Sequence, residues 1–275
     1  MIGLSLSLSL GGGNPSAPFS ATFTSSLPGS VTFTRASTGT YFNSSGVLSS
    51  AAIDVARIDT NPSTLAARGL LIEESRTNGL TYSEQLDNAA WTKGSGTVVT
   101  ANQATAPDGA TTADLVVGDG GGGGIYNNAA IGASLARTRS VYMRSVSGTC
   151  TVTMKDPGLT VGVVNCDLTT TWQRFTLSET TTGLGLWVAN IPAGGIYMWG
   201  AQIEVGGTVS SYIPTVAATA TRAVDAASFT VPAGVGTLTY TFDDNTTQTV
   251  AVSPGAYSIP TTLNRAWIKS IVGSA

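Results

Sequence analysis

Apolar and polar residues alternate in short runs along much of the chain, and the runs are interrupted by Gly, Asn, Asp and Pro. From residue 97 onward eight such runs follow one another: TVVTA, TADLVV, RSVYMRSV, TCTVTM, TVGVVN, WQRFTLS, LGLWVAN and GIYMWGAQIE. A period of two places every second side chain on the same face of a strand, and closely spaced short strands are typical of an antiparallel sandwich or jelly roll. The pattern therefore predicts an all-β fold with a jelly-roll β-sandwich at about residues 79–216. Helical periodicity is limited to a turn or two at residues 83–90.

A second alternating pattern follows a connector that contains Pro and Ala. Leu238, Tyr240 and Phe242 alternate with Thr, DDNT supplies a turn, and Val250 and Val252 alternate on the other side of that turn. This is the pattern of a β-hairpin with one apolar face. Because an isolated hairpin is marginal in water, we expect residues 217–275 to form a connector and a small C-terminal β module that packs on other strands.

The first 78 residues are predicted to form a docking strand and an extended arm. Leu4, Leu6, Leu8 and Leu10 alternate with serines, so the leucines share one face of an extended strand. This strand either begins the chain's own sheet or completes the sheet of a neighbouring subunit by edge addition. Residues 11–78 contain short strand-like runs between turn signals such as LPGS, NSSG and TNPS. The N-terminus lacks the basic segment of a signal peptide, and no apolar run reaches the ~20 residues of a membrane span.

Composition narrows the possible functions. The chain has 275 residues, of which 42% are hydrophobic and 33 are Gly, so we expect a buried core with many turns. It contains no His, which excludes Ser-His-Asp chemistry, His general bases and most catalytic zinc sites. The net charge is −3 and no Lys/Arg cluster occurs, so nucleic acid is not an expected ligand.

The cysteines and aspartates give little indication of a cofactor. Cys150 and Cys166 lie in strand-like runs, where they are either buried thiols or a single disulfide. Asp108 and Asp114 in APDGATTAD are the one candidate seed for a structural Ca²⁺, although aspartates that cap turns explain the same pattern. The glycine run at 120–124 lacks the context of a phosphate loop and is interpreted as a turn.

Four charged residues surround an apolar triplet in ARGLLIEESRTN (67–78), although only 11% of the chain is charged. The triplet at 70–72 is predicted to anchor the arm. Arg68, Glu73, Glu74 and Arg76 are predicted to pair with groups across a structural junction, since partly buried ion pairs give specificity more reliably than stability. A role for Glu73 and Glu74 as the acid and base of a glycosidase is disfavoured, because adjacent strand residues point to opposite faces and could not flank one bond.

Six ordered blocks resemble a widespread family of tailed-bacteriophage virion proteins of tail-fibre, minor structural or head-fibre type. The blocks, spread over residues 31–225, are FTRASTGTYFNSSGVL, ARIDTNPSTLAARGLLIEESRTNGLTYSE, NAAW, TAPDGATTAD, GIYMWGAQIEVG and SSYIPTVAATATRAVD. The resemblance implies a central domain similar to carbohydrate-binding jelly rolls, with TTWQRFTLS as one of its strands. Gly79 and the long glycine run depart from the family pattern, which leaves the local loop geometry open.

Aromatic residues are the candidate sugar-binding groups, because an aromatic face packs on a pyranose while polar groups bind its hydroxyls. Core packing is the alternative role for each. Tyr126 and Trp187 lie beside glycine-rich turns and are the favoured exposed platforms, whereas Trp199 alternates along an inner strand and is expected in the core. The remaining candidates are Trp91, Tyr142 and Trp172.

We therefore expect a non-catalytic virion structural protein of tail-fibre or adhesin type on the virion surface, with no cofactor. Its expected partners are other virion proteins through the N-terminal arm, further copies of itself in a trimer, and host surface polysaccharide. A head-decoration or head-fibre protein with a mainly structural role is the alternative. A polysaccharide depolymerase is disfavoured, because the carboxylates are scattered and no repeat of 20 to 50 residues is present.

Overall fold

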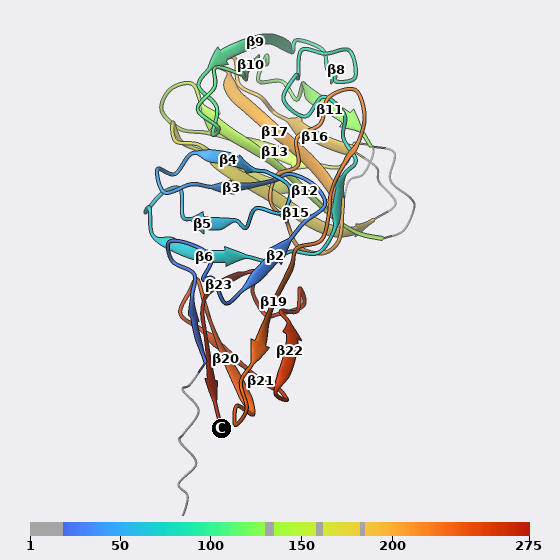
Figure 1. Cartoon of the computed structure of the whole chain (residues 1–275). Coiled ribbons are helices and arrows are strands. Elements are labelled where there is room, and N and C mark those ends of the chain that lie inside the picture. Colours follow the sequence, from blue (N-terminus) through green and yellow to red (C-terminus); the bar gives the residue numbers. More distant parts are fainter. Residues whose placement is uncertain (1–18, 130–134, 158–161, 182–184) are drawn as a thin grey trace, which may run out of the picture.

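The computed structural model describes residues 19–129, 135–157, 162–181 and 185–275. These residues form β-strands and turns and contain no α-helix, which confirms the predicted all-β class. Figure 1 shows an elongated molecule with a broad β-sandwich at one end and a narrow base, which contains the C-terminus, at the other. Within the described ranges no helix could span a bilayer. The predicted docking leucines Leu4, Leu6, Leu8 and Leu10 lie outside the described residues.

The sandwich consists of two five-stranded antiparallel sheets among the described residues. The front sheet has the order β15 (Gln173–Thr181), β12 (Leu135–Ser145), β17 (Ile196–Val205), β10 (Ala113–Val117) and β9 (Val98–Ala104). The back sheet has the order β14 (Val164–Leu168), β13 (Cys150–Lys155), β16 (Gly185–Ala189), β11 (Gly124–Asn128) and β8 (Thr92–Lys93). The chain crosses repeatedly from one sheet to the other, as the predicted jelly roll requires.

The core of the sandwich follows from the period of two. In β12 Val141 and Met143 are buried between the sheets, while Tyr142 and Arg144 point to the outer face of the front sheet. In the back sheet, β13 contributes Val152 in the same way. The alternation in the sequence thus specifies which side chains enter the core.

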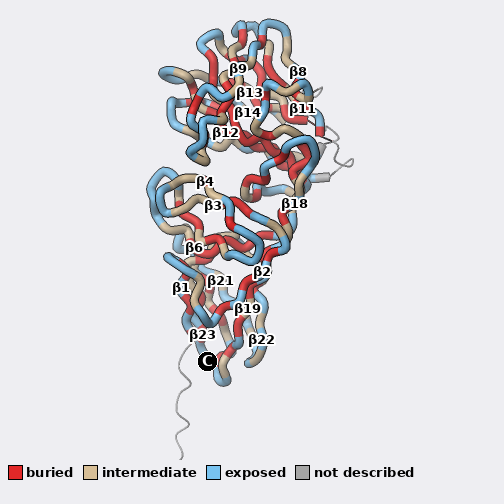
Figure 2. The backbone as a smooth tube through the Cα atoms, turned by 45° about the horizontal axis from the view of Figure 1, so that its top comes forward, coloured by how far each residue is buried: buried red, intermediate tan, exposed pale blue. Residues whose placement is uncertain are grey.

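The base has a second core of its own. One sheet has the order β21 (Thr247–Ala251), β20 (Thr237–Phe242), β23 (Trp267–Ser274), β6 (Ala67–Leu71) and β5 (Ile58–Thr60), and β1 (Ser20–Thr22) also pairs with β23. The facing sheet has the order β2 (Thr32–Thr34), β19 (Ala226–Val231) and β22 (Gly255–Ser258). Phe19 and Phe229 stack between them with ring centroids 4.2 Å apart. Figure 2 shows buried residues in both the sandwich and the base.

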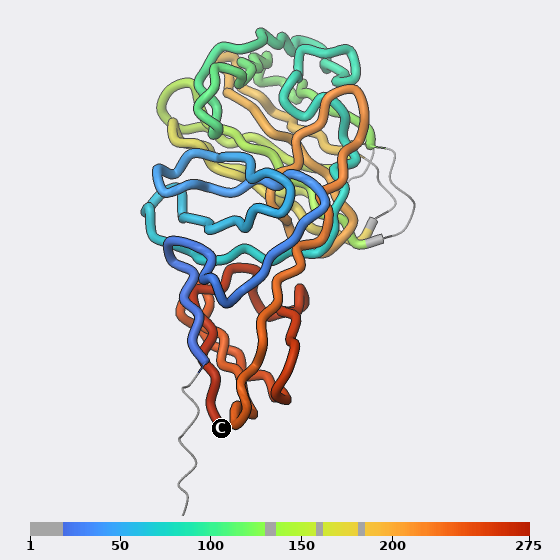
Figure 3. The backbone as a smooth tube through the Cα atoms, viewed as in Figure 1, coloured from blue at the N-terminus to red at the C-terminus, as the bar shows by residue number. Residues whose placement is uncertain are grey.

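Both ends of the described chain build the base together. β6 pairs with β23, β1 pairs with β23, and β2 pairs with β19. Figure 3 shows the blue N-terminal and red C-terminal segments side by side in this region. The ranges 1–78 and 217–275, predicted as separate units, therefore share sheets, because the apolar faces of these short strands are covered only when the strands pair and pack together.

Two further strand pairs connect the base to the sandwich. The hairpin of β3 (Gly39–Phe42) and β4 (Leu48–Ala51) packs on the outer face of the front sheet, where Leu48 shares a cluster with Tyr142, Trp199 and Tyr212. β7 (Arg76–Asn78) pairs with β18 (Ala220–Arg222) at the entry to and exit from the sandwich. The front sheet, the hairpin and the base thus meet in one region.

Candidate functional site

A cleft of about 740 Å³ opens where these three parts meet. One wall is the β3–β4 hairpin, another is the outer face of β12 and β15, and the third comes from β5, β6 and β23 of the base. Concave sites lined by apolar and aromatic groups with a few polar groups are the usual form of a small-ligand site. The cleft is therefore the candidate functional site.

Two cross-strand rows on the outer face of the front sheet lie at the sandwich wall, and Tyr142, Trp172 and Arg174 from these rows line the cleft. In the first row Tyr142 of β12 lies between Trp199 of β17 and Arg174 of β15. In the adjacent row Arg144 stacks on Tyr197 and on Trp172, with its guanidinium carbon 4.6 and 5.3 Å from the two ring centroids. The period of two places all these groups on the outer face, opposite the sandwich core. The wall therefore carries aromatic rings interleaved with arginines.

Aromatic side chains reach the cleft from every wall. The hairpin contributes Tyr41 and Phe42, the front sheet Tyr142 and Trp172, and the base Trp267. The indole of Trp172 is half-buried and donates a 2.9 Å hydrogen bond to the carbonyl of Thr105, which holds the ring in place. The buried indole N–H of Trp267 has no hydrogen-bond partner in the part of the chain that the structure describes.

Arg174 is the polar group of the sandwich wall. It donates to the carbonyl of Ser210 at 2.8 Å and to the hydroxyl of Ser140 at 2.9 Å, and it lies over the ring of Tyr142 at 5.3 Å. Its Nε is buried and has no partner among the described residues. Both hydrogen-bond acceptors are neutral, so the contacts hold the guanidinium in position without compensating its charge.

On the base side, Asp59 and Arg68 form an ion pair with 3.5 Å between their closest atoms. Arg68 also lies over the ring of Trp267, 5.0 Å from its centroid. Burial raises the pKa of Asp59 to about 6, and a hydrogen bond from the backbone N–H of Phe42 and the charge of Arg68 only partly oppose this effect. A carboxyl group at the edge of the cleft therefore changes its charge near neutral pH.

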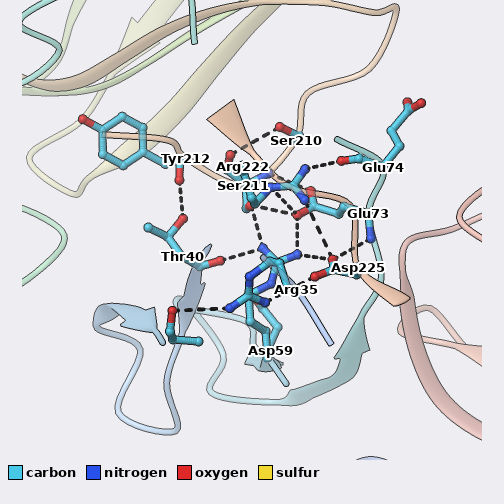
Figure 4. A network of polar contacts seen from close by, with 12 residues as sticks. Arg35, Thr40, Asp59, Glu73, Glu74, Ser210, Ser211, Tyr212, Arg222 and Asp225 are labelled. Carbon is cyan, nitrogen blue, oxygen red and sulfur yellow. Dashed lines mark hydrogen bonds and ion pairs between the residues drawn. The ribbon is translucent and has the colours of Figure 1, made fainter. Parts of the chain in front are cut away.

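A buried ionic network, shown in Figure 4, lies next to residues that line the cleft. Asp225 accepts from Arg35 at 3.2 Å and from Arg57 at 2.5 Å, and Glu73 accepts from Arg57 at 2.8 Å. Arg222 lies 3.5 Å from Glu73. These groups come from the N-terminal arm, from the strand that leads into the sandwich, and from the segment that leaves it. The network therefore fixes the position of the sandwich relative to the base.

The same network connects to the cleft through Ser211. The hydroxyl and the backbone N–H of Ser211 each donate to Glu73 at 2.7 Å. Burial alone would raise the pKa of Glu73, but Arg57, Arg222 and these two hydrogen bonds hold it at about 2. Arg57 also donates to the backbone carbonyl of Thr40 at 3.0 Å. The charged network thus supports two segments that line the cleft.

The motif ARGLLIEESRTN is divided among these features. Its apolar triplet at 70–72 is buried, in agreement with the predicted anchor. Glu73 belongs to the buried network, and Arg68 pairs with Asp59 across β5 and β6. Glu74 is instead mostly exposed and pairs only with Arg76, two residues further on. Its pair is therefore local and spans no junction, because alternation turns the side chain of Glu74 away from the interior.

The two favoured platform residues are adjacent, but they lie on the other sheet. Tyr126 of β11 and Trp187 of β16 are cross-strand neighbours on the outer face of the back sheet, with ring centroids 6.0 Å apart. Lys155 of β13 lies opposite Trp187 and places its ammonium 4.0 Å from the ring centroid. Both rings are half-buried. This pair forms a shallow surface feature beside strands, whereas the cleft is concave.

The other aromatic candidates occupy different environments. Trp91 is 1% exposed in the sandwich core and donates to the carbonyl of Tyr82 at 2.9 Å, so its ring presents no face to solvent. Tyr142 lines the cleft but is only 5% exposed. Trp199 is buried, but it belongs to the cluster on the outer face of the front sheet and lies outside the core between the sheets. The β3–β4 hairpin and Tyr212 cover that face, which explains its burial.

The aspartates suggested as a Ca²⁺ seed bind backbone N–H groups. Asp114 is buried and accepts from Leu86 at 2.7 Å and from Asn102 at 2.9 Å, while Asp108 accepts from Ala110 within its own turn. No group of three acidic or sulfur ligands suited to a metal occurs among the described residues. The two cysteines are free thiols, of which Cys166 is buried and Cys150 is partly exposed.

Several residues that line the cleft were not predicted from the sequence. Trp172 was a candidate but Arg174 was not, although the two alternate in TTWQRFTLS and the period of two places them on one face. Tyr41 and Trp267 come from segments more than 200 residues apart along the chain. No local pattern indicates that such distant side chains face one cleft.

No protein-family profile and no curated protein matches the chain. Among solved structures, the enzymatically active domain of tailspike protein 4 from bacteriophage CBA120 is 12% identical, with a TM-score of 0.37 over 47% of this chain and 21% of that chain. A tandem of two family 22 carbohydrate-binding modules from Paenibacillus barcinonensis is 11% identical, with a TM-score of 0.36 over 74% and 91%. A family 11 carbohydrate-binding module from Clostridium thermocellum is 11% identical, with a TM-score of 0.31 over 50% and 98%. The similar structures thus include a phage tailspike domain, of which the chain spans about a fifth, and carbohydrate-binding modules.

Proposed function

We propose that this protein is a non-catalytic, glycan-binding component of a bacteriophage virion surface, of tail-fibre or adhesin type. The observation that carries the glycan-binding part is the cleft, in which Tyr41, Trp172 and Trp267 supply aromatic faces and Arg68 and Arg174 supply hydrogen-bond donors. Aromatic faces bind the apolar face of a sugar, and fixed donors bind its hydroxyl or acidic groups. The virion part is supported by the ordered sequence blocks between residues 31 and 225.

The absence of catalysis is part of the proposal. Hydrolysis of a glycosidic bond usually requires two carboxyl groups that face each other across the site. Among the described residues that line the cleft, Asp59 is the single carboxylate, and it is paired with Arg68. The proposal predicts that the protein binds a polysaccharide and releases no new reducing ends from it.

Assembly and location complete the proposal. The protein is expected to be a trimer, attached to other virion proteins through its N-terminal arm. Several copies would multiply a weak affinity per cleft into firm attachment. Light scattering on the purified protein tests the oligomer, and a monomer at high concentration would count against it.

A glycan array of bacterial surface polysaccharides, probed with multivalent protein, tests the binding function. Trp172→Ala should weaken binding to the selected glycan at least about tenfold, which corresponds to about 1.4 kcal/mol, because it removes one aromatic face of the cleft. Trp187→Ala is the matched control, since it removes a half-buried tryptophan from the back sheet. Equal thermal midpoints of the two variants and the wild type would show that the fold is intact.

Two results would contradict the proposal. If multivalent protein retains no glycan, the function is wrong. If Trp187→Ala loses binding while Trp172→Ala keeps it, the glycan binds at the back sheet and the cleft is not the site.

A further inference from the structure

Positive charge gathers at the cleft of a protein whose net charge is −3 and which contains only 13 Lys and Arg residues. Arg68 and Arg174 line the cleft, and Arg144 stacks on the cleft residue Trp172. The single carboxylate among the described lining residues is Asp59. A neutral sugar requires no such excess of cations at its binding site.

Most arginines at and behind the cleft have a carboxylate partner. Asp59 already pairs with Arg68. Behind the cleft, Arg35 and Arg57 bind Asp225, and Arg222 lies within ion-pair distance of Glu73. Each of these arginines has a carboxylate partner, as partly or fully buried cations generally require.

Arg174 differs from them. Its terminal nitrogens donate to the carbonyl of Ser210 and to the hydroxyl of Ser140. Among the described residues its Nε has no partner, and no carboxylate lies within ion-pair distance. The two hydrogen bonds restrain the planar guanidinium before any ligand arrives. A positioned guanidinium with uncompensated charge beside an aromatic ring is suited to a carboxylate, which it binds through charge-assisted hydrogen bonds.

We propose that the cleft binds an acidic glycan, with the carboxylate of a uronic-acid-type sugar at Arg174 and a sugar ring against Trp172. This inference deepens the proposed glycan-binding function and rests on it. The approaching carboxylate neutralises Arg174, the one of the two cleft-lining arginines without a carboxylate partner among the described residues. Arg144, which also has no such partner among them, adds a second positive charge next to the stacked ring. Long-range attraction between these cations and a polyanionic chain also favours association.

The test uses oligosaccharides that contain galacturonate, glucuronate or mannuronate, each paired with its carboxyl-reduced neutral counterpart. Affinities are measured by isothermal titration calorimetry on the full chain. At least one acidic member should bind about tenfold or more tightly than its reduced partner, and this preference should shrink as NaCl rises from 20 to 300 mM because salt screens the charge. The neutral partner should show little dependence on salt.

Variants at position 174 assign the preference to its residue. Arg174→Gln should abolish the difference between the acidic and the reduced oligosaccharide, and Arg174→Lys should retain part of it because the charge remains. Arg265→Gln is the matched control, since Arg265 is about one-third exposed, pairs with Asp243 and Asp244, and is not among the residues that line the cleft. Thermal midpoints of all three variants establish that each is folded.

The outcomes separate the two proposals. If reduced oligosaccharides bind as tightly as acidic ones and Trp172→Ala abolishes that binding, the protein binds glycans but the acidic specificity is wrong. The specificity is also wrong if the preference survives in Arg174→Gln, or if sulfated oligosaccharides bind and uronates do not. If neither member of any pair binds, the acidic specificity is overturned together with glycan binding at this cleft.

Discussion

Asp225 offers the sharpest test of how the sandwich and the base are held together. Its carboxylate is fully buried and accepts from Arg35 at 3.2 Å, from Arg57 at 2.5 Å and from the backbone N–H of Glu73 at 2.8 Å. One side chain thus connects the arm, the strand that enters the sandwich and the segment that leaves it. Asp225→Asn keeps the size of the side chain and removes its charge.

The expected cost follows from the charges left behind. Without the negative charge of Asp225, Arg35 loses its carboxylate partner, and Arg57 and Arg222 share the carboxylate of Glu73. Removing one partner of a buried ion pair typically costs about 3–5 kcal/mol. With an unfolding entropy of about 0.6 kcal/mol/K for a chain of this size, a loss of about 4 kcal/mol lowers the thermal midpoint by about 7 °C.

Thermal and urea unfolding, followed by circular dichroism, measure this loss. Asp167→Asn is the control, because it makes the same chemical change on an exposed residue of β14 and should cost less than about 0.5 kcal/mol. The double variant Arg35→Met/Asp225→Asn should recover part of the loss, since it removes the cation that the single change leaves unpaired. If Asp225→Asn shifts the midpoint no more than the control does, the network does not stabilise the junction and the reasoning fails.

Three further predictions concern single residues. Because burial raises the pKa of Asp59 from 3.8 to about 6, the folded state holds this proton more tightly than the unfolded chain, and about 3 kcal/mol of stability is lost as pH rises from about 4 to 6. Asp59→Asn should flatten that decline in urea titrations at several pH values, and an unchanged slope would contradict the assignment. Gly69 has a φ of +99°, and an added Cβ would clash with the backbone carbonyl of Ile268 in β23. Gly69→Ala should therefore lower the free energy of unfolding by at least about 3 kcal/mol in the same assay. A neutral effect would argue against the β6–β23 pairing. Burial raises the pKa of the Cys166 thiol to about 11, so this thiol should resist iodoacetamide at pH 8 while the partly exposed Cys150 reacts. Peptide mass mapping measures the labelling of each cysteine, and equal labelling would refute the difference in burial.

The sequence by itself determined the class of the fold and much of its core. The alternation in β12 identified inward and outward faces, because a strand exposes side chains with a period of two. In β17 the same pattern misplaced Trp199, because the register shifts beside Gly200, so that Trp199 points outward while Ala201 and Ile203 point into the core. The pattern at Leu238, Tyr240 and Phe242 likewise marked residues that the structure buries completely. Burial of Leu70, Leu71 and Ile72 was predicted because these residues form an apolar triplet between charged residues.

Only the tertiary structure decided which strands are neighbours and what the cleft contains. The pairing of β6 and β1 with β23 joins segments about 200 and about 250 residues apart, and backbone hydrogen bonds are chemically the same for every candidate partner. The sequence also showed that Arg57, Arg174 and Asp225 exist, but not that Asp225 would compensate Arg57 and leave Arg174 unpaired. Whether a charge is satisfied depends on distances of a few ångströms between distant segments, and those distances are fixed only when the sandwich, the hairpin and the base pack together.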